Sequence, residues 1–384
     1  MKKSELDFEQ GPIRPPSESG SLLLRVTRNC PWNRCAFCST YKGKKFSRRP
    51  IEEILTDIDT MATIYNEIKK ISWTMGDAGQ FTNRVISSVF KDSVLPDAFR
   101  SVAYWIASGG ETIFLQDANS LMLSTASLID ILNHIRRNFP QVIRVTSYAR
   151  ASTLKQKTVD EYIRLKECGL SRLHVGMESG SDRVLKLIDK GCKSEQLIEG
   201  GKRVVDAGIS LSLYVIPGIG GIELSAEHTS ETAQAINAVN PTFVRFRSLY
   251  VRANTALEQM KAQGKFNPPD EDHIVMEIRD IVDRLHNITT TIVSDHVLNL
   301  LEEVEGKLPE DKKKILKIID QYLNLPYEER LIYQLGRRGG AFRSVNDLYE
   351  PGVFARLEMA KKEIEKDLPG GIPEYIQAIK KRFV

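Results

Sequence analysis

The feature that most constrains the fold is a regular alternation of apolar, strand-like runs with helical patterns through the middle of the chain. Strands that alternate with helices pair in parallel through right-handed crossovers, which predicts an α/β fold. Such a sheet either stays open or curls, and we expect a partial (β/α)6 barrel. Its reactive loops should lie at the carboxyl ends of the strands. The six strand-like runs are 21–27, 112–116, 142–147, 171–177, 210–216 and 242–249.

Three regions follow from this pattern. Residues 1–20 are polar and rich in proline and glycine, which predicts an irregular arm. Residues 21–256 carry the strand–helix alternation, together with a helix expected from Asn83 to Phe99. Residues 257–384 should be mainly helical, with one strand at Thr290–Val293. The helical patterns of this last region are 271–286, 296–303, 310–323, 327–335, 352–366 and 373–382.

The composition of the chain argues against several classes of protein. The chain has 384 residues, of which 41% are hydrophobic, and its net charge of +4 does not indicate a nucleic-acid-binding protein. No run approaches the roughly 18 apolar residues that span a bilayer, and the first residues do not resemble a signal peptide. We therefore expect a cytoplasmic protein. Three of the five cysteines fall within nine residues, which indicates a metal site more than a disulfide framework.

Cys30, Cys35 and Cys38 follow the first predicted strand, where a cofactor site belongs. Three thiolates from one loop can ligate three irons of a [4Fe–4S] cluster and leave the fourth open to an exogenous ligand. A structural zinc site is the rival interpretation, but zinc usually takes four ligands in paired motifs. The alternatives to an enzyme are thus a zinc-stabilised binding module and a non-catalytic iron–sulfur protein.

The cysteine loop resembles that of the radical S-adenosylmethionine (radical SAM) superfamily, whose usual spacing is Cys-x₃-Cys-x₂-Cys with an aromatic residue before the last cysteine. Phe37 matches this aromatic residue, whereas four residues separate Cys30 from Cys35. The resemblance covers residues 21–256 and is nearest to the branch of oxygen-independent coproporphyrinogen dehydrogenases and methylthiotransferases. It implies an oxygen-sensitive enzyme that reductively cleaves S-adenosylmethionine to a 5′-deoxyadenosyl radical. It also implies an electron donor, such as flavodoxin or ferredoxin, and an organic substrate that the sequence does not identify.

The resemblance further implies which strand ends bind the cofactor. Polar groups after the second strand would bind the methionyl amino group, Glu178 would bind the ribose hydroxyls, and the glycine-rich end of the fifth strand would approach the adenine that Phe37 also contacts. The predicted cofactor-binding residues are Phe37, Gln116, Asp117, Ser147, Glu178, Ser179, Ile216, Pro217 and Gly218.

Four residues are candidates for catalysis. Tyr148 and Arg150 lie at the end of the third strand, and an equal alternative for Arg150 is a structural bond to loop carbonyls. Asp295 and His296 follow an apolar run and can bind substrate or transfer a proton, although helix capping is the alternative for at least one of them. Cys168 and Cys192 stand alone and are expected to be buried fillers.

Overall fold

The computed structural model describes residues 6–383. These residues form two compact units, each assembled from separate stretches of the chain. Unit 1 contains residues up to 33, residues 43–175 and residues 203–210. Unit 2 contains residues 34–42, residues 176–202 and the chain from 211 onwards. The predicted region boundaries at residues 20 and 256 stay a prediction.

The sheet of unit 1 is parallel. Strand β1 (Leu22–Arg25) pairs with β4 (Thr112–Gln116), and β4 pairs with β5 (Arg144–Arg150), so that Leu24 lies opposite Leu115. The next strand in the order is β6 (Leu170–Glu178), whose last three residues belong to unit 2. The apolar residues of β1 and β4 are buried, as expected for strands covered on both faces.

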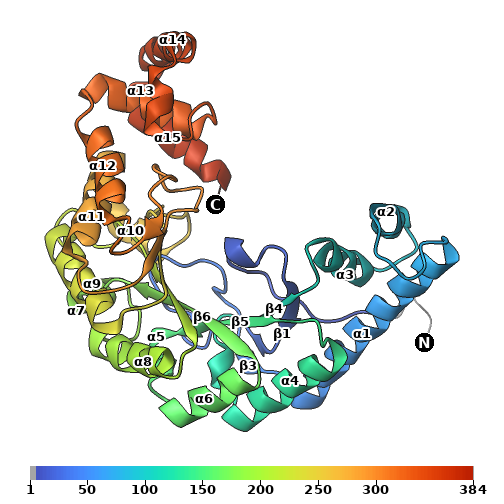
Figure 1. Cartoon of the computed structure of the whole chain (residues 1–384). Coiled ribbons are helices and arrows are strands. Elements are labelled where there is room, and N and C mark those ends of the chain that lie inside the picture. The colour runs from blue at the N-terminus through green and yellow to red at the C-terminus, as the bar shows by residue number, and fades with distance from the viewer. Residues whose placement is uncertain (1–5, 384) are drawn as a thin grey trace. The chain divides into compact units, whose positions relative to one another are not determined.

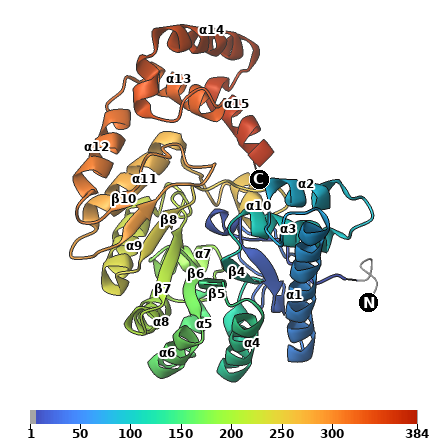
Figure 2. The ribbon, with the colours of Figure 1, turned by 45° about the vertical axis from the view of Figure 1, so that its right-hand side comes forward.

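The helices of unit 1 cover this sheet. Helices α1 (Ile51–Thr74), α4 (Thr125–Asn138) and α6 (Val159–Glu167) run side by side (Figures 1 and 2). The single helix predicted over 83–99 is wrong, because the structure has two helices, α2 (Asn83–Lys91) and α3 (Asp97–Ala107). Asp92 caps the turn between them by accepting a bond from the Val94 amide at 2.9 Å, and Pro96 has no amide hydrogen to continue a helix. The short helix α5 spans Ala151–Leu154.

Unit 2 continues the parallel pattern. Strand β7 (Ser210–Val215) pairs with β8 (Phe243–Phe246), and β8 pairs with β9 (Thr291–Val293), which confirms the strand predicted near 290–293. Strand β10 (Gly306–Lys307) is antiparallel to β9. The α/β expectation is therefore confirmed, with a mostly parallel sheet. A further antiparallel pair, β2 (Thr27–Arg28) and β3 (Ser47–Arg48), lies in unit 1.

The helices of unit 2 include a C-terminal group of α13 (Tyr327–Arg338), α14 (Pro351–Asp367) and α15 (Gly371–Lys380), which pack against one another (Figure 2). Their contact is made by leucines and isoleucines that are buried in α13 and α15 and partly buried in α14. No helix among residues 6–383 has the length and apolar character to cross a bilayer. The helices are α7 (Asp182–Leu187), α8 (Ser194–Asp206, whose last four residues belong to unit 1), α9 (Ser225–Val239), α10 (Ala256–Ala262), α11 (Glu271–Arg284), α12 (Lys312–Leu323), α13 (Tyr327–Arg338), α14 (Pro351–Asp367) and α15 (Gly371–Lys380).

The helix predicted over 296–303 is wrong, since this segment is irregular. The Asn299 side chain donates to the Phe246 carbonyl at 2.8 Å and accepts from the Ser248 amide at 2.8 Å. The Arg338 guanidinium donates to the carbonyls of Val297 and Leu298 at 3.0 and 2.9 Å. Arg338 thus bonds two carbonyls that a helix would have paired, and Asn299 ties the segment to the end of β8.

Candidate functional site

The first part of the cysteine loop lies in unit 1 and is fixed on both sides of Cys30. Asn29 and Asn33 adopt left-handed conformations, with φ of 66° and 51°, which asparagine tolerates better than most residues. Their side-chain amides donate to the carbonyls of Lys45 at 2.7 Å and Lys44 at 3.1 Å. The segment 44–45 therefore holds the backbone that presents Cys30.

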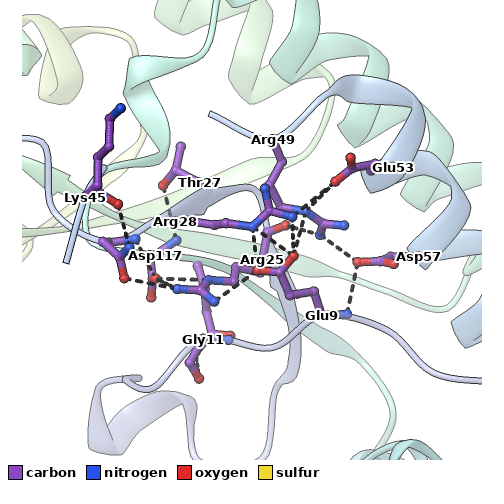
Figure 3. Close-up of polar contacts among 12 residues, drawn as sticks. Glu9, Gly11, Arg25, Thr27, Arg28, Lys45, Arg49, Glu53, Asp57 and Asp117 are labelled. Carbon is purple, nitrogen blue, oxygen red and sulfur yellow. Dashed lines mark hydrogen bonds and ion pairs between the residues drawn. The ribbon is translucent and has the colours of Figure 1, made fainter. Parts of the chain in front are cut away.

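The carboxyl end of β4 is tied to the same loop (Figure 3). Asp117 is fully buried, and its Oδ2 accepts hydrogen bonds from Arg25 Nε at 3.1 Å and Arg25 Nη2 at 2.6 Å. The same oxygen accepts from the Asn29 amide at 3.0 Å. The predicted contact of Asp117 with a cofactor stays a prediction, while its bonds to the protein position the residue that precedes Cys30.

Glu9, from the N-terminal arm, lies among three arginines (Figure 3). It accepts hydrogen bonds from Arg25 Nη1 at 3.0 Å and from Arg28 Nη2 at 2.6 Å, and it lies 3.3 Å from Arg49 Nε. The bonds from Arg28, with the charges of the three arginines, lower the pKa of Glu9 below its ordinary value. Arg49 also donates to Asp57 at 2.6 Å. This network was not predicted from the sequence, because nothing in the spacing of Glu9 links it to Arg25.

The N-terminal arm also occupies the side chain of Gln116. Its Oε1 accepts from the Gly11 amide at 2.7 Å, and its Nε2 donates to the carbonyls of Gly11 at 3.1 Å and Ile13 at 2.6 Å. A Cβ at Gly11 would collide with the buried Asp117 carboxylate, 2.5 Å from its Oδ1. The arm predicted to be irregular is thus bonded to the strand end that carries two predicted cofactor contacts.

The predicted residues of β5 make contacts within unit 1. Ser147 is buried and donates to the Leu115 carbonyl at 3.1 Å. The Tyr148 ring meets Phe114 edge to face, with centroids 5.0 Å apart. The Arg150 guanidinium lies 5.3 Å from the ring centroid of Trp32, a cation–π contact with the cysteine loop. Arg150 therefore has a structural contact, and its catalytic role stays a prediction.

The second part of the cysteine loop lies in unit 2. The backbone of Ala36, between Cys35 and Cys38, donates to the Ile188 carbonyl at 2.8 Å and accepts from the Leu257 amide at 2.9 Å. Ala36 and Phe37 pack against a core that includes Ile216 and Leu249. This packing sets the direction of the predicted aromatic residue.

A cavity of about 170 Å³ in unit 2 brings several predicted residues together. Phe37 and Cys38 come from the cysteine loop, Ile216 follows β7, and His296 follows β9. From separate segments of the sequence, Phe37 and Ile216 were predicted to bind the cofactor, Cys38 to ligate the cluster and His296 to be a candidate for catalysis. The rest of the lining is Ser39, Thr40, Arg247, Ser248, Leu249, Tyr250, Arg252 and Leu298.

Glu178 lies at the carboxyl end of β6 with a left-handed φ of 64°. Its Oε1 accepts a hydrogen bond from Lys190 Nζ at 2.5 Å, and both residues are buried. Burial lowers the pKa of Lys190, but the charges of Glu178, Cys35 and Cys192 outweigh it and raise the pKa to about 12. Lys190 thus places a positive charge near one predicted cluster ligand. Lys190 was not predicted from the sequence, because a lysine after a short helix is ordinarily exposed.

A buried polar chain links two more predicted residues. Ser179 Oγ lies 2.8 Å from His228 Nδ1, and the Gly218 amide donates to Glu277 Oε2 at 2.5 Å. His228 Nε2 lies 3.7 Å from the same Glu277 oxygen. Burial raises the pKa of Glu277 to about 7 and lowers the pKa of His228 to about 4. The ends of β6 and β7 are therefore joined through α9 and α11.

The remaining predicted residues lie at separate places in the chain and make different contacts. Asp295 pairs with Arg245 at 2.7 Å and does not line the cavity of unit 2. The Pro217 carbonyl accepts from the Leu249 amide at 2.9 Å. Ser181, two residues after Ser179, caps helix α7 by accepting a bond from the Val184 amide. Cys168 and Cys192, predicted to be buried, are both half-buried.

The cysteines fit a thiolate-bound cluster by their chemistry. None of the five cysteines forms a disulfide within the described chain, and Cys30, Cys35 and Cys38 are all partly exposed. Cys30 belongs to unit 1, whereas Cys35 and Cys38 belong to unit 2. Within residues 6–383, no three His, Cys, Asp or Glu side chains form a group that is arranged to hold a metal ion.

The family model of the radical SAM superfamily matches residues 89–233. A tRNA uridine(34) acetyltransferase of Methanocaldococcus infernus is 25% identical over 33% of this chain and 23% of its own length. The heme chaperone HemW of Bacillus subtilis is 24% identical over 43% of this chain and 44% of its own length. The match therefore spans less than half of either relative.

Solved radical SAM structures also match. The cobalamin-dependent S-adenosylmethionine radical enzyme OxsB has a TM-score of 0.45 and 14% identity over 93% of this chain and 57% of its own. Coproporphyrinogen III oxidase (HemN) of Escherichia coli has a TM-score of 0.41 and 15% identity over 68% of this chain and 50% of its own. The family model and the curated relatives confirm the resemblance to the superfamily.

Proposed function

We propose that this radical SAM protein is an enzyme that cleaves S-adenosylmethionine and abstracts hydrogen from an organic substrate. The single observation that carries the proposal is the cavity of unit 2, which Phe37, Cys38 and Ile216 line together. A nucleotide bound to an iron would need a cluster ligand beside it and apolar groups against its base. Cys38 would be that ligand, and Phe37 and Ile216 would be those apolar groups.

Cys30, Cys35 and Cys38 would hold a [4Fe–4S] cluster, as the three cysteines of superfamily members do. When bound, the cluster and S-adenosylmethionine supply a one-electron cleavage that yields methionine and a 5′-deoxyadenosyl radical. The protein supplies position and exclusion of water. Phe37 and Ile216 would contact the adenine, and Glu178 would accept bonds from the ribose hydroxyls while Lys190 balances its charge.

The reaction needs an electron from a partner, and the surface beside Cys30 favours an acidic carrier. Lys44, Lys45 and Arg48 are exposed, while the carbonyls of the two lysines are bonded to Asn33 and Asn29. The segment thus carries positive charge on the surface and is fastened to the loop that presents a cluster ligand. Opposite charges steer weak redox encounters and bring the two centres close.

The test is anaerobic reconstitution with iron and sulfide, followed by measurement of 5′-deoxyadenosine formed from S-adenosylmethionine with dithionite. We expect a brown protein that forms 5′-deoxyadenosine. Cys30→Ala, Cys35→Ala and Cys38→Ala should each abolish this product, whereas Cys168→Ala, a half-buried cysteine outside the loop, should retain it.

Two results would refute the enzyme. Zinc without iron or sulfide would make the protein a zinc-stabilised module. A complete cluster with no cleavage would make it a non-catalytic iron–sulfur protein. If the protein does form 5′-deoxyadenosine, deuterium transfer from candidate substrates into this product would identify the substrate.

A further inference from the structure

The lining of the unit 2 cavity divides by chemistry. Phe37, Ile216 and Leu249 are apolar, whereas Arg247, Arg252 and His296 bring two guanidinium groups and an imidazole to the same space. A cavity of about 170 Å³ is smaller than a site for a whole drug-sized ligand. It suits the end groups of ligands, with an apolar side and a cationic side.

The arginines near His296 differ in how their charges are balanced. Arg245 pairs with Asp295 at 2.7 Å, and Arg338 pairs with Glu271 at 2.6 Å. In contrast, the side chains of Arg247 and Arg252 form no ion pair or hydrogen bond with any residue from 6 to 383. Arg247 lies over the Tyr214 ring, 5.2 Å from its centroid, which orients the guanidinium and leaves its donors unused.

Both of these arginines are half-buried residues that line the cavity. Positive charge that is partly removed from water is unfavourable without a counter-charge. Two guanidinium groups that line one cavity and have unused donors match the oxygens of a carboxylate or a phosphate.

His296 supplies a third donor. Its Nδ1 accepts a bond from the Leu298 amide at 3.3 Å, which assigns the proton of the neutral ring to Nε2. Burial and the charges of Arg247, Arg252 and Arg338 lower the pKa of His296 to about 3. The ring is therefore neutral at physiological pH, and its Nε2–H can donate a hydrogen bond to an anion.

The C-terminal helices hold this cationic side in place. Arg338, at the end of α13, donates to the carbonyls of Val297 and Leu298 that follow His296. Glu271 fixes Arg338 and also accepts a bond from Lys380 of α15 at 2.7 Å. Burial opposes ionisation of Glu271, but the charges of Arg338 and Lys380 outweigh it and lower the pKa to about 2.

We propose that Arg247, Arg252 and His296 form a binding site for a carboxylate or phosphate group of the substrate, beside Cys38. The inference rests on the proposed function for the identity of the reaction, and it adds the class of substrate, an organic anion. The site also gives the C-terminal helices a role, since they fix one of its walls.

The test measures binding of two probes, inorganic phosphate and succinate, to the anaerobically reconstituted protein by equilibrium dialysis. At least one probe should bind the unchanged protein. Arg247→Gln and Arg252→Gln should each weaken that binding at least tenfold, and Arg252→Lys should have an intermediate effect because it keeps the charge. Arg284→Gln is the matched control, since Arg284 is exposed at the end of α11.

The dissociation constant for S-adenosylmethionine is measured on the same proteins and should change less than twofold. A parallel loss of S-adenosylmethionine affinity would assign the arginines to the cofactor and overturn the inference. Absence of binding by both probes, or unchanged binding by the variants, would also overturn it. The visible spectrum of the cluster and the melting temperature show whether each variant is folded.

Failure of the proposed function and failure of the anion site give different results. If the unchanged protein binds a probe through these arginines but forms no 5′-deoxyadenosine, the anion site stands and the enzyme does not. If it forms 5′-deoxyadenosine but binds no probe, the enzyme stands and the anion site does not. Binding of phosphate alone would select a phosphorylated substrate, and binding of succinate alone a carboxylic acid.

Discussion

The guanidinium of Arg25 donates two hydrogen bonds to one oxygen of the Asp117 carboxylate, at 3.1 Å from Nε and 2.6 Å from Nη2. The same oxygen accepts from the backbone of Asn29. A buried charge with three donors holds its neighbours in one arrangement, because any displacement leaves the charge unpaired. Arg25 and Asp117 thus couple the ends of β1 and β4 to the start of the cysteine loop.

Asp117→Asn should weaken this coupling. The amide oxygen can still accept from Arg25 and Asn29 but carries no charge, which leaves the half-buried guanidinium of Arg25 without this counter-charge, so we expect the free energy of unfolding to fall by about 3 kcal/mol. Iron bound after reconstitution should fall by at least half. Asp130→Asn, at an exposed position of α4, should change neither quantity. Full iron content in Asp117→Asn would show that the loop does not depend on this pair.

Gly180 is expected to be intolerant of any side chain. A Cβ there would collide with the Glu231 carbonyl and lie 2.6 Å from the Thr232 Cα, and backbone atoms cannot rotate away as side chains can. Gly180→Ala should lower the free energy of unfolding in urea by about 2 kcal/mol or more. Gly352→Ala meets no atom within 4 Å and should be neutral or stabilising by roughly 0.5 kcal/mol. Equal stability of the two variants would contradict the packing around Gly180.

Glu277 should make stability depend on pH. The folded pKa of Glu277, about 7, exceeds its unfolded value, so the folded state binds more protons than the unfolded state between pH 4.5 and 7. This extra protonation stabilises the folded state at low pH, and the stabilisation is lost as pH rises through this range. Glu277→Gln lacks this titration. The stability of the unchanged protein relative to the variant should therefore fall by about 3 kcal/mol between pH 4.5 and 8.

Urea unfolding of both proteins across that range measures the difference. His228, whose pKa is lowered by burial, titrates in both proteins and largely cancels in the comparison. A constant difference between the two proteins would show that Glu277 is not protonated in the folded state at neutral pH.

The sequence predicts the regular parts of this fold and the apolar side of the site. Apolar runs are local signals, so the strands β4 and β7 could be predicted from periodicity. Phe37 and Ile216 were found through the resemblance, and the structure places them on one cavity.

The missed residues share a different property. Glu9 bonds Arg25 and Arg28 across 16 and 19 residues of chain, and Arg338 bonds Glu271 across 67. Such pairs depend on the final packing and leave no periodic signal. The helix wrongly predicted over 296–303 has the same cause, because Arg338 takes the carbonyls that the helix would have used.

The basic segment beside Cys30 should govern electron delivery by a protein donor. Reversing two exposed charges in Lys44→Glu/Lys45→Glu replaces attraction to an acidic carrier with repulsion, while the carbonyl bonds to Asn33 and Asn29 remain available. Reduction of the cluster by reduced flavodoxin at low salt should slow at least tenfold, and the difference should shrink at 0.5 M salt because the charges are screened.

Dithionite distinguishes docking from damage to the cluster, since this small reductant needs no protein interface. Its rate should be the same in the variant and the unchanged protein. Lys69→Glu, an exposed lysine of α1, is the control for net charge and should leave the flavodoxin rate within twofold. Equal slowing with dithionite would mean that the substitutions disturb the loop around Cys30, and unchanged flavodoxin rates would place the docking surface elsewhere.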